Sequence, residues 1–185
     1  MALTKTPVCD FGKKAEDFKL KSIDNNVITL NDIKGEKATL IMFICNHCPY
    51  VKAIIKDLAK DCNELRNDGI NSVAIMSNDT KNYPEDSFEN MIKFADSNNF
   101  GNINYLFDET QEIAKKYGAV CTPDFFGYNK DLSLQYRGRF RELKDLKPIN
   151  NGDSDLKIAM KMVAQTQKGP DEQIPSMGCN IKWFN

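Results

Sequence analysis

The sequence lacks the features that mark a nucleic-acid-binding or membrane protein. Its 25 Lys and Arg residues are balanced by 26 Asp and Glu, for a net charge of −1, and no basic stripe with interleaved aromatics occurs. The longest unbroken apolar run extends only over residues 40–45, far below the roughly 20 residues that cross a bilayer. The first seven residues lack the apolar stretch of a secretory signal. We therefore expect a cytoplasmic protein without nucleic-acid or membrane partners.

Cofactor motifs are missing as well. Neither G-x-G-x-x-G nor a P-loop pattern is present, so we expect no organic cofactor. The chain has one histidine and no second C-x-x-C or C-x-x-H pair. A four-ligand zinc site would therefore have to gather Cys9, Cys121 and Cys179 from distant parts of the chain. We expect no resident metal.

What the sequence does contain is typical of a globular protein. Hydrophobic residues make up 41% and charged residues 28% of its 185 residues, which suits one ordinary domain. No internal repeat, heptad pattern or linker divides the chain. We predict a single domain over residues 1–185, with a core over about 8–168 and a C-terminal tail over 169–185.

Apolar runs bounded by chain breakers predict an α/β protein. A buried strand over 38–45 is followed by a helical stripe over 51–65 and a second apolar strand, which implies a parallel pair joined by a right-handed crossover. Helices, a later hairpin and an N-terminal hairpin complete a mixed sheet with helices on both faces. The remaining predicted elements are strands at 18–23, 27–30, 70–76, 103–107, 125–128 and 132–136, and helices at 84–95, 113–117 and 156–163.

A cysteine pair stands where the first buried strand ends and a helix begins, in the run Cys45-Asn46-His47-Cys48-Pro49. The free N–H groups and dipole of a helix N-terminus stabilise a thiolate, and two intervening residues let both sulfurs close a disulfide. A cationic His47 would favour the thiolate further; the alternative is a solvated loop histidine. The cysteines could also be buried packing residues or part of a metal site. The pattern predicts thiol–disulfide exchange at Cys45 and Cys48.

Several segments in the right order resemble the AhpC/TSA (peroxiredoxin-like) branch of the thioredoxin-like superfamily. Residues 12–20 are similar to its G-x-x-A-P-D-F-x-L segment, with Glu16 in place of proline, and residues 30–35 match the turn before its first core strand. Over nearly the whole chain the sequence also resembles bacterial peroxiredoxin-like proteins with C-N-H-C-P-[YF]-V, T-P-D, R-G-R and G-C-x-I-K-W motifs. The resemblance implies a thioredoxin-like fold, with the first hairpin as an N-terminal extension.

The resemblance also implies a role for Thr122-Pro123, which falls where the superfamily places a cis-proline. A cis peptide facing the C-x-x-C pair would expose backbone groups that pair with the extended chain of a substrate. The alternative is an ordinary trans proline at the start of a strand.

The other cysteines have less specific settings. Cys62 lies on the apolar stripe of a helix and is expected in the core, and Cys9 is close to the N-terminus and is expected to be incidental. Cys121 precedes Thr122-Pro123 and is either a third exchange partner or a packing residue. Cys179 is either a resolving thiol in the tail or a buried anchor for it.

Three functions remain open from the sequence. The first is a dithiol–disulfide oxidoreductase, in which Cys45 attacks and Cys48 resolves, acting on a protein disulfide or a low-molecular-weight thiol. The second is a thiol peroxidase in which Cys48, followed by proline as in peroxiredoxins, reacts with peroxide and Arg137 or Arg139 steadies the thiolate. In that case Cys45 replaces the usual Thr or Ser. The third is a metal-binding or redox-sensing module that adds His47 or Cys179 to the pair.

Overall fold

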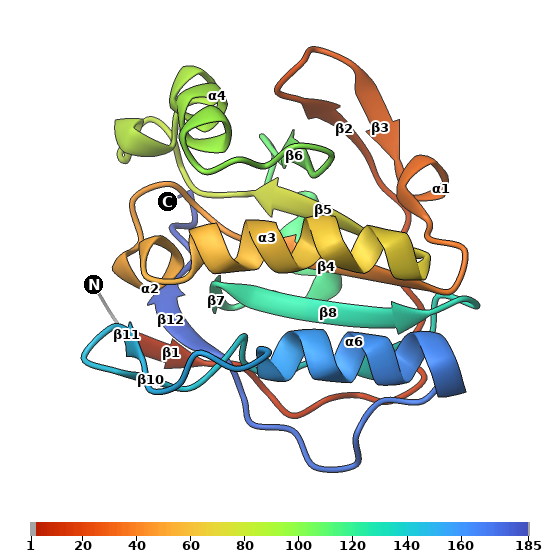
Figure 1. Cartoon of the computed structure of the whole chain (residues 1–185). Helices are drawn as coiled ribbons and strands as arrows, with labels where there is room; N and C mark the ends of the chain where they lie inside the picture. Colours follow the sequence, from red (N-terminus) through yellow and green to blue (C-terminus); the bar gives the residue numbers. More distant parts are fainter. Residues whose placement is uncertain (1–2, 185) are drawn as a thin grey trace.

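The structure is a computed structural model that describes residues 3–184. Its centre is a seven-stranded mixed sheet in the order β3-β2-β6-β5-β4-β8-β9 (Figure 1). The strands are β1 (Leu3–Lys5), β2 (Lys19–Ser22), β3 (Val27–Thr29), β4 (Ala38–Phe43), β5 (Ile70–Met76), β6 (Asn104–Phe107), β7 (Cys121–Thr122), β8 (Asp124–Asn129), β9 (Leu134–Tyr136), β10 (Leu143–Lys144), β11 (Lys147–Pro148) and β12 (Met177–Asn180). The helices are α1 (Leu30–Ile33), α2 (Pro49–Lys52), α3 (Ile55–Leu65), α4 (Phe88–Ser97), α5 (Glu112–Tyr117) and α6 (Asp155–Thr166), with 3₁₀ turns η1 (Arg66–Asp68) and η2 (Pro84–Asp86).

Strand β4 is buried along its whole length because helices cover both faces of the sheet. Its alternating side chains divide between two apolar clusters. Leu40 and Met42 pack with α3, α4 and α6, whereas Ile41 and Phe43 pack with α1 and α5. β4 runs parallel to β5 and antiparallel to β8, which confirms the mixed sheet and the crossover inferred from the apolar runs. The β2–β3 hairpin forms one edge, as predicted for the N-terminal extension.

Two predicted helices are interrupted, and both breaks lie near the cysteine pair. The stripe over 51–65 is divided into α2 and α3, since the Ile54 amide bonds to the Val51 carbonyl in a tighter 3₁₀-type turn. The helix expected from Pro84 is a 3₁₀ turn, η2, and α4 begins only at Phe88. The reason is Ser87, which has extended backbone and whose hydroxyl caps α4 by accepting from the Asn90 amide at 3.3 Å. Because of this break Asp86 lies in the η2 turn, from which its carboxylate reaches the loop that follows β4.

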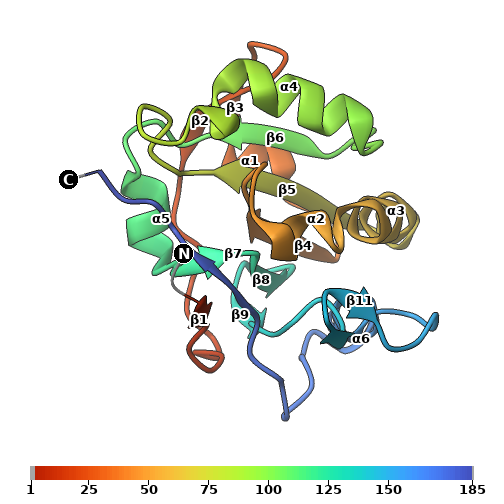
Figure 2. The same ribbon diagram turned by 90° about the vertical axis from the view of Figure 1, so that its left-hand side faces the viewer.

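The C-terminal tail forms a strand in a second sheet, of order β1-β12-β7. β12 is antiparallel to both neighbours, with Cys179 opposite Leu3 on one side and Thr122 on the other. Figure 1 shows β1 and β12 side by side at the left of the molecule, and Figure 2 views that side directly. The tail therefore covers the end of β4 where the cysteine pair lies.

No helix among residues 3–184 is long and apolar enough to cross a bilayer.

Candidate active site

Cys45 and Cys48 lie where strand β4 gives way to helix α2. Cys45 follows the end of β4 by two residues, and Cys48 is the N-cap of α2, with Pro49 as the first helical residue. Proline is compatible with that position because the first helical amides have no partner within the helix. Both cysteine side chains are free thiols, and both residues are fully buried.

Thr122 contacts both sulfurs. The Thr122–Pro123 peptide is cis, as the family resemblance implies. The Thr122 hydroxyl lies 3.3 Å from the Cys45 sulfur, and the Cys48 sulfur lies 3.1 Å from the Thr122 carbonyl oxygen, to which it donates when it is protonated. The turn before β8 therefore holds the two thiols from one side.

Cys179 is the third sulfur of the site. It lies on β12 directly opposite Thr122, and its sulfur is 3.1 Å from that of Cys48. Its residue is only 4% exposed. The tail cysteine is therefore in contact with the redox pair.

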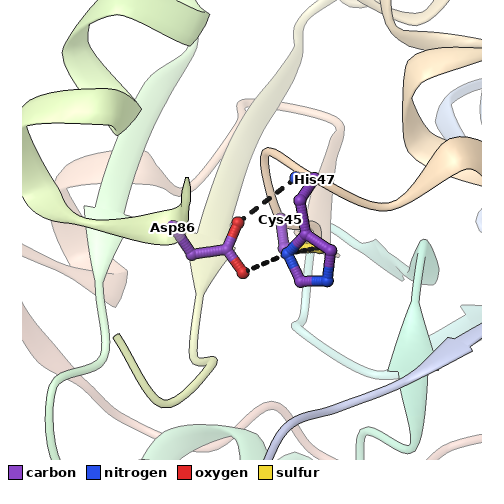
Figure 3. Close-up of side chains that lie close together, drawn as sticks. All are labelled: Cys45, His47 and Asp86. Atoms are coloured by element: carbon purple, nitrogen blue, oxygen red, sulfur yellow. Dashed lines mark hydrogen bonds and ion pairs between the residues drawn. The ribbon is translucent and has the colours of Figure 1, made fainter. Parts of the chain in front are cut away.

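Asp86 closes the other side of the site, as Figure 3 shows for its contacts with His47. Its carboxylate accepts from the backbone amides of Asn46 and His47 at 2.8 and 3.3 Å, and from the Asn78 side chain at 2.8 Å. It also lies 2.7 Å from His47 Nδ1. A carboxylate only accepts, so Nδ1 carries the proton of this bond. Asp86 thereby fixes the loop between the two cysteines and the tautomer of its histidine.

Two aromatic residues support that loop from outside. The buried Tyr105 hydroxyl donates to the Asn46 side-chain oxygen over 2.9 Å. The Tyr83 ring stacks on the His47 imidazole, with ring centroids 5.6 Å apart and planes 8° from parallel. His47 is therefore fixed by Asp86 and Tyr83, unlike the solvated loop histidine of the alternative interpretation.

The two thiols influence each other's ionisation. Their mutual hydrogen bond lowers the pKa of Cys48 to about 5 and, together with burial and the Asp86 charge, raises the pKa of Cys45. Cys179 and the Val51 amide at the start of α2 favour the Cys48 thiolate as well. The first negative charge of the pair therefore resides on Cys48.

His47 and Cys179 are shifted by their own neighbours. The hydrogen bond to Asp86 raises the pKa of His47, against the opposing effect of its partial burial. Burial and the neighbouring Cys48 raise the pKa of Cys179 to about 12. In the reduced protein Cys179 is therefore a protonated thiol in contact with a thiolate.

The remaining cysteines lie apart from this chemistry or are inert in it. Cys121 is buried, its thiol faces the Pro123 carbonyl at 3.5 Å, and burial raises its pKa. Cys62 lies in the core beside Met42, and burial raises its pKa to about 12. Cys9 is half-buried, and its pKa is raised to about 11.

Both arginines of the R-G-R segment are engaged elsewhere. Arg137 pairs with the buried carboxylate of Asp124 at 2.9 Å and lies over the Phe126 ring. Arg139 pairs with Asp155 at 2.6 Å. Within the described chain neither guanidinium hydrogen-bonds to a cysteine of the pair.

Cys45, His47 and Asp86 also place a sulfur, a nitrogen and an oxygen within 4.8 Å of one another. Soft and borderline metals accept such ligands. Here, however, both Asp86 oxygens accept hydrogen bonds, and His47 Nδ1 spends its proton on one of them. These hydrogen bonds account for the close approach of Asp86 and His47 without an ion.

Asp86, Asn78 and Tyr105 are the site residues that sequence reasoning missed. The one sequence signal for Asp86 was the Pro84-Glu85-Asp86 run. This run is typical of the first turn of a helix and so did not indicate a site residue.

The chain is similar to known proteins both in sequence and in structure. The AhpC/TSA family matches residues 11–140. An uncharacterized conserved protein from Geobacillus kaustophilus has 41% identity and a TM-score of 0.94, covering 100% of this chain and 97% of its own. A hypothetical protein from Sinorhizobium meliloti 1021 has 38% identity and a TM-score of 0.90, covering 98% of each chain.

A more distant structure is described as part of an oxidoreductase. The thioredoxin domain of a thiol-disulfide oxidoreductase from Bacteroides vulgatus has 17% identity and a TM-score of 0.59, covering 70% of this chain and 89% of its own. At that identity the likeness shows the fold, which is thioredoxin-like. No curated protein matches the sequence.

Proposed function

Because the chain belongs to the AhpC/TSA family and has a thioredoxin-like fold, we propose that it is a thiol–disulfide oxidoreductase whose Cys45 and Cys48 alternate between dithiol and disulfide. The family and the fold are those of redox enzymes that act on protein or thiol substrates. One observation carries the finer proposal: the two sulfurs lie at the N-terminus of α2 and both contact Thr122.

The reaction follows from the ionisation of the pair. The Cys48 thiolate attacks one sulfur of a substrate disulfide, forms a mixed disulfide and releases the other sulfur as a thiolate. Cys45 then attacks the Cys48 sulfur, closing the Cys45–Cys48 disulfide and releasing the second substrate thiol. The Cys45 proton passes to a leaving thiolate, and the substrate gains the two electrons that the pair loses. We propose this order in place of the sequence-based hypothesis, in which Cys45 attacks first, because the lowered pKa of Cys48 favours its thiolate.

Asp86 and His47 act as positioning residues for this pair. Asp86 holds the backbone amides of Asn46 and His47, so the spacing of the two sulfurs is fixed before the substrate arrives. The raised pKa of His47 keeps a positive charge near the thiols at pH values where an ordinary histidine is partly neutral.

Oxidised glutathione tests the proposal. We expect reduced wild-type protein to form the Cys45–Cys48 disulfide, found by acid quenching, alkylation in denaturant and peptide mapping. A Cys45→Ser/Cys179→Ser double variant should retain a glutathione adduct at Cys48, because both neighbouring thiols are gone. Cys9→Ser is the matched control and should behave like wild type.

An adduct at Cys45 in a Cys48→Ser variant, with none at Cys48 in the double variant, restores the Cys45-first order. Oxidation no faster in wild type than in Cys48→Ser contradicts the exchange function.

A thiol peroxidase is the second candidate, and the low pKa of Cys48 together with the following Pro49 favours it. The Cys48 thiolate would attack one peroxide oxygen, releasing hydroxide and leaving a sulfenic acid that Cys45 resolves with loss of water. Against it, Arg137 and Arg139 are held by carboxylates away from the pair. Hydrogen peroxide with the Cys45→Ser/Cys179→Ser variant separates the two functions, since only a peroxidase forms sulfenic acid at Cys48 faster than glutathione forms an adduct there.

A further inference from the structure

The end of the chain fills the position at which a substrate strand would pair with the site. β12 is hydrogen-bonded antiparallel to β7, with Cys179 opposite Thr122 and Asn180 opposite Cys121. Thr122 contacts both sulfurs of the pair, so an extended substrate that brings a cysteine to the site would pair with this backbone edge. Cys179 thus occupies the place of a substrate cysteine, with its sulfur 3.1 Å from that of Cys48.

The close approach of β12 depends on Gly178. A Cβ atom at this position would lie 2.1 Å from the Thr122 carbonyl oxygen and 3.1 Å from the Pro123 ring. Any larger residue would therefore push the strand away from β7. Gly178 thus lets β12 approach β7 closely enough for Cys179 to contact Cys48. This requirement distinguishes Cys179 from an incidental buried cysteine.

From this arrangement we infer that Cys179 is a third redox-active residue, which exchanges with Cys48 to form a Cys48–Cys179 disulfide on the protein's own tail. The inference rests on the proposed exchange function and extends it. Starting from the Cys45–Cys48 disulfide, the Cys179 thiolate attacks the Cys48 sulfur. The Cys48–Cys179 bond forms, the Cys45–Cys48 bond breaks, and Cys45 leaves as a thiolate that takes up the proton lost by Cys179. No external oxidant is consumed in this step.

The distance and the charges suit this exchange. Sulfurs 3.1 Å apart are within the range of reacting atoms held ready for attack. The Cys48 charge is one cause that holds the Cys179 pKa high, and it disappears when Cys48 enters a disulfide. Lys182 then favours the Cys179 thiolate, and the Thr122 hydroxyl favours the departing Cys45 thiolate. Burial still raises the pKa of Cys179 after oxidation of the pair, but the contribution of Cys48 to that raised pKa is gone.

A Cys45→Ser variant isolates the new bond. After reaction of the reduced variant with oxidised glutathione, we expect a Cys48–Cys179 cross-linked peptide and loss of alkylation at Cys179. A Cys45→Ser/Cys121→Ser variant is the matched control and should keep the cross-link, because Cys121 faces the Pro123 carbonyl and not Cys48. A stable glutathione adduct at Cys48, with Cys179 fully alkylated in Cys45→Ser, would overturn the inference.

Gly178→Ala tests the same bond without removing a sulfur. We expect the added methyl group to displace β12, so that the cross-link is lost in a Cys45→Ser/Gly178→Ala variant while the Cys45–Cys48 disulfide still forms in Gly178→Ala alone. Thermal melting establishes that the variant is folded. An undiminished cross-link would contradict the strand-dependent mechanism. Failure of the exchange function itself looks different, because wild type would then form neither disulfide and no variant would carry an adduct at Cys48.

Discussion

Asp124 and Asp86 are two fully buried carboxylates that are stabilised in different ways. Asp124 begins β8, directly after the cis-proline, and pairs with the Arg137 guanidinium at 2.9 Å. Asp86, in the η2 turn, is held by two backbone amides, the Asn78 side chain and His47. One carboxylate has a permanent cation as its partner, whereas the other has a titratable one.

This difference in partners suggests different roles: Asp124 supports the fold, whereas Asp86 controls the active site. Arginine stays protonated at every pH at which a protein is folded, so the cation beside Asp124 is permanent. Histidine changes charge near neutral pH, so the cation beside Asp86 is lost as pH rises. Asp86 also fixes the loop between the two cysteines, while Asp124 anchors the strand behind them. Each carboxylate can be tested by removing its partner.

The largest effect is expected from Arg137→Met, which leaves Asp124 buried without a cation but keeps an apolar side chain over Phe126. Breaking a buried ion pair by removing one partner costs about 3–5 kcal/mol of the free energy of unfolding. Urea unfolding measures it. An Arg137→Met/Asp124→Leu double variant should recover much of the loss, since no buried charge remains. A loss within the error of the measurement in Arg137→Met would show that Asp124 finds other compensation.

Asp86→Asn is expected to have a smaller effect on stability. The amide keeps one oxygen for the backbone amides of the cysteine loop but loses the oxygen that accepts from both Asn78 and His47. We expect a loss of about 1–3 kcal/mol, the cost of leaving a buried polar group unsatisfied. The same variant should return the pKa of His47 toward its ordinary value, measurable by NMR titration of the single imidazole. An unchanged His47 pKa would contradict the pairing.

The pH dependence of that loss sharpens the comparison. Because Asp86 raises the folded-state pKa of His47 above its ordinary value of 6.5, the ion pair contributes fully below that value. Its contribution disappears as pH rises through the raised folded-state pKa. The difference in unfolding free energy between wild type and Asp86→Asn should therefore shrink from mildly acidic to mildly alkaline pH. The cost of Arg137→Met should not shrink over this window, because burial raises the pKa of Asp124 and ionising this carboxyl without its cation becomes more costly as pH rises. A parallel decrease in both costs would refute the distinction.

Tyr105→Phe is expected to have the smallest effect. It removes the hydroxyl that donates to Asn46 and leaves the Asp86 contacts in place. Loss of this hydrogen bond should cost about 1 kcal/mol. Urea unfolding measures the stability, and the rate of glutathione adduct formation at Cys48 reports whether the loop has shifted. A larger loss of reactivity than of stability would place Tyr105 among the residues that position the thiols.

Local patterns were enough to locate half of the site. Cys45 and Cys48 could be placed at a strand–helix junction because an apolar run and a helical stripe meet there. The cis-proline followed from a family motif. Arg137, by contrast, was visible as a charge near the hairpin, but its partner Asp124 was not, because a buried acid cannot be distinguished from an exposed one in a single sequence.

The other half depends on contacts between distant parts of the chain. Asp86 reaches Asn46 from a 3₁₀ turn that the sequence presents as the start of a helix. β12 has only four residues and no regular alternation, so its pairing with β7 has no local signal. The contact between Cys179 and Cys48 follows from that pairing, so the sequence could offer a resolving thiol only as one of two alternatives for Cys179. Element types were predictable from side-chain periodicity, whereas long-range partners were not.

The β1-β12-β7 sheet also bears on the order in which the protein folds. The pairing of Leu3 with Cys179 closes a loop that contains almost every other element. Loop closure costs more entropy as the loop grows, and contacts of large sequence separation form slowly. We therefore expect the central sheet to fold first and the terminal strands to dock last. Until they dock, Cys179 is far from Cys48, so a bond between these two sulfurs marks a chain whose folding is complete.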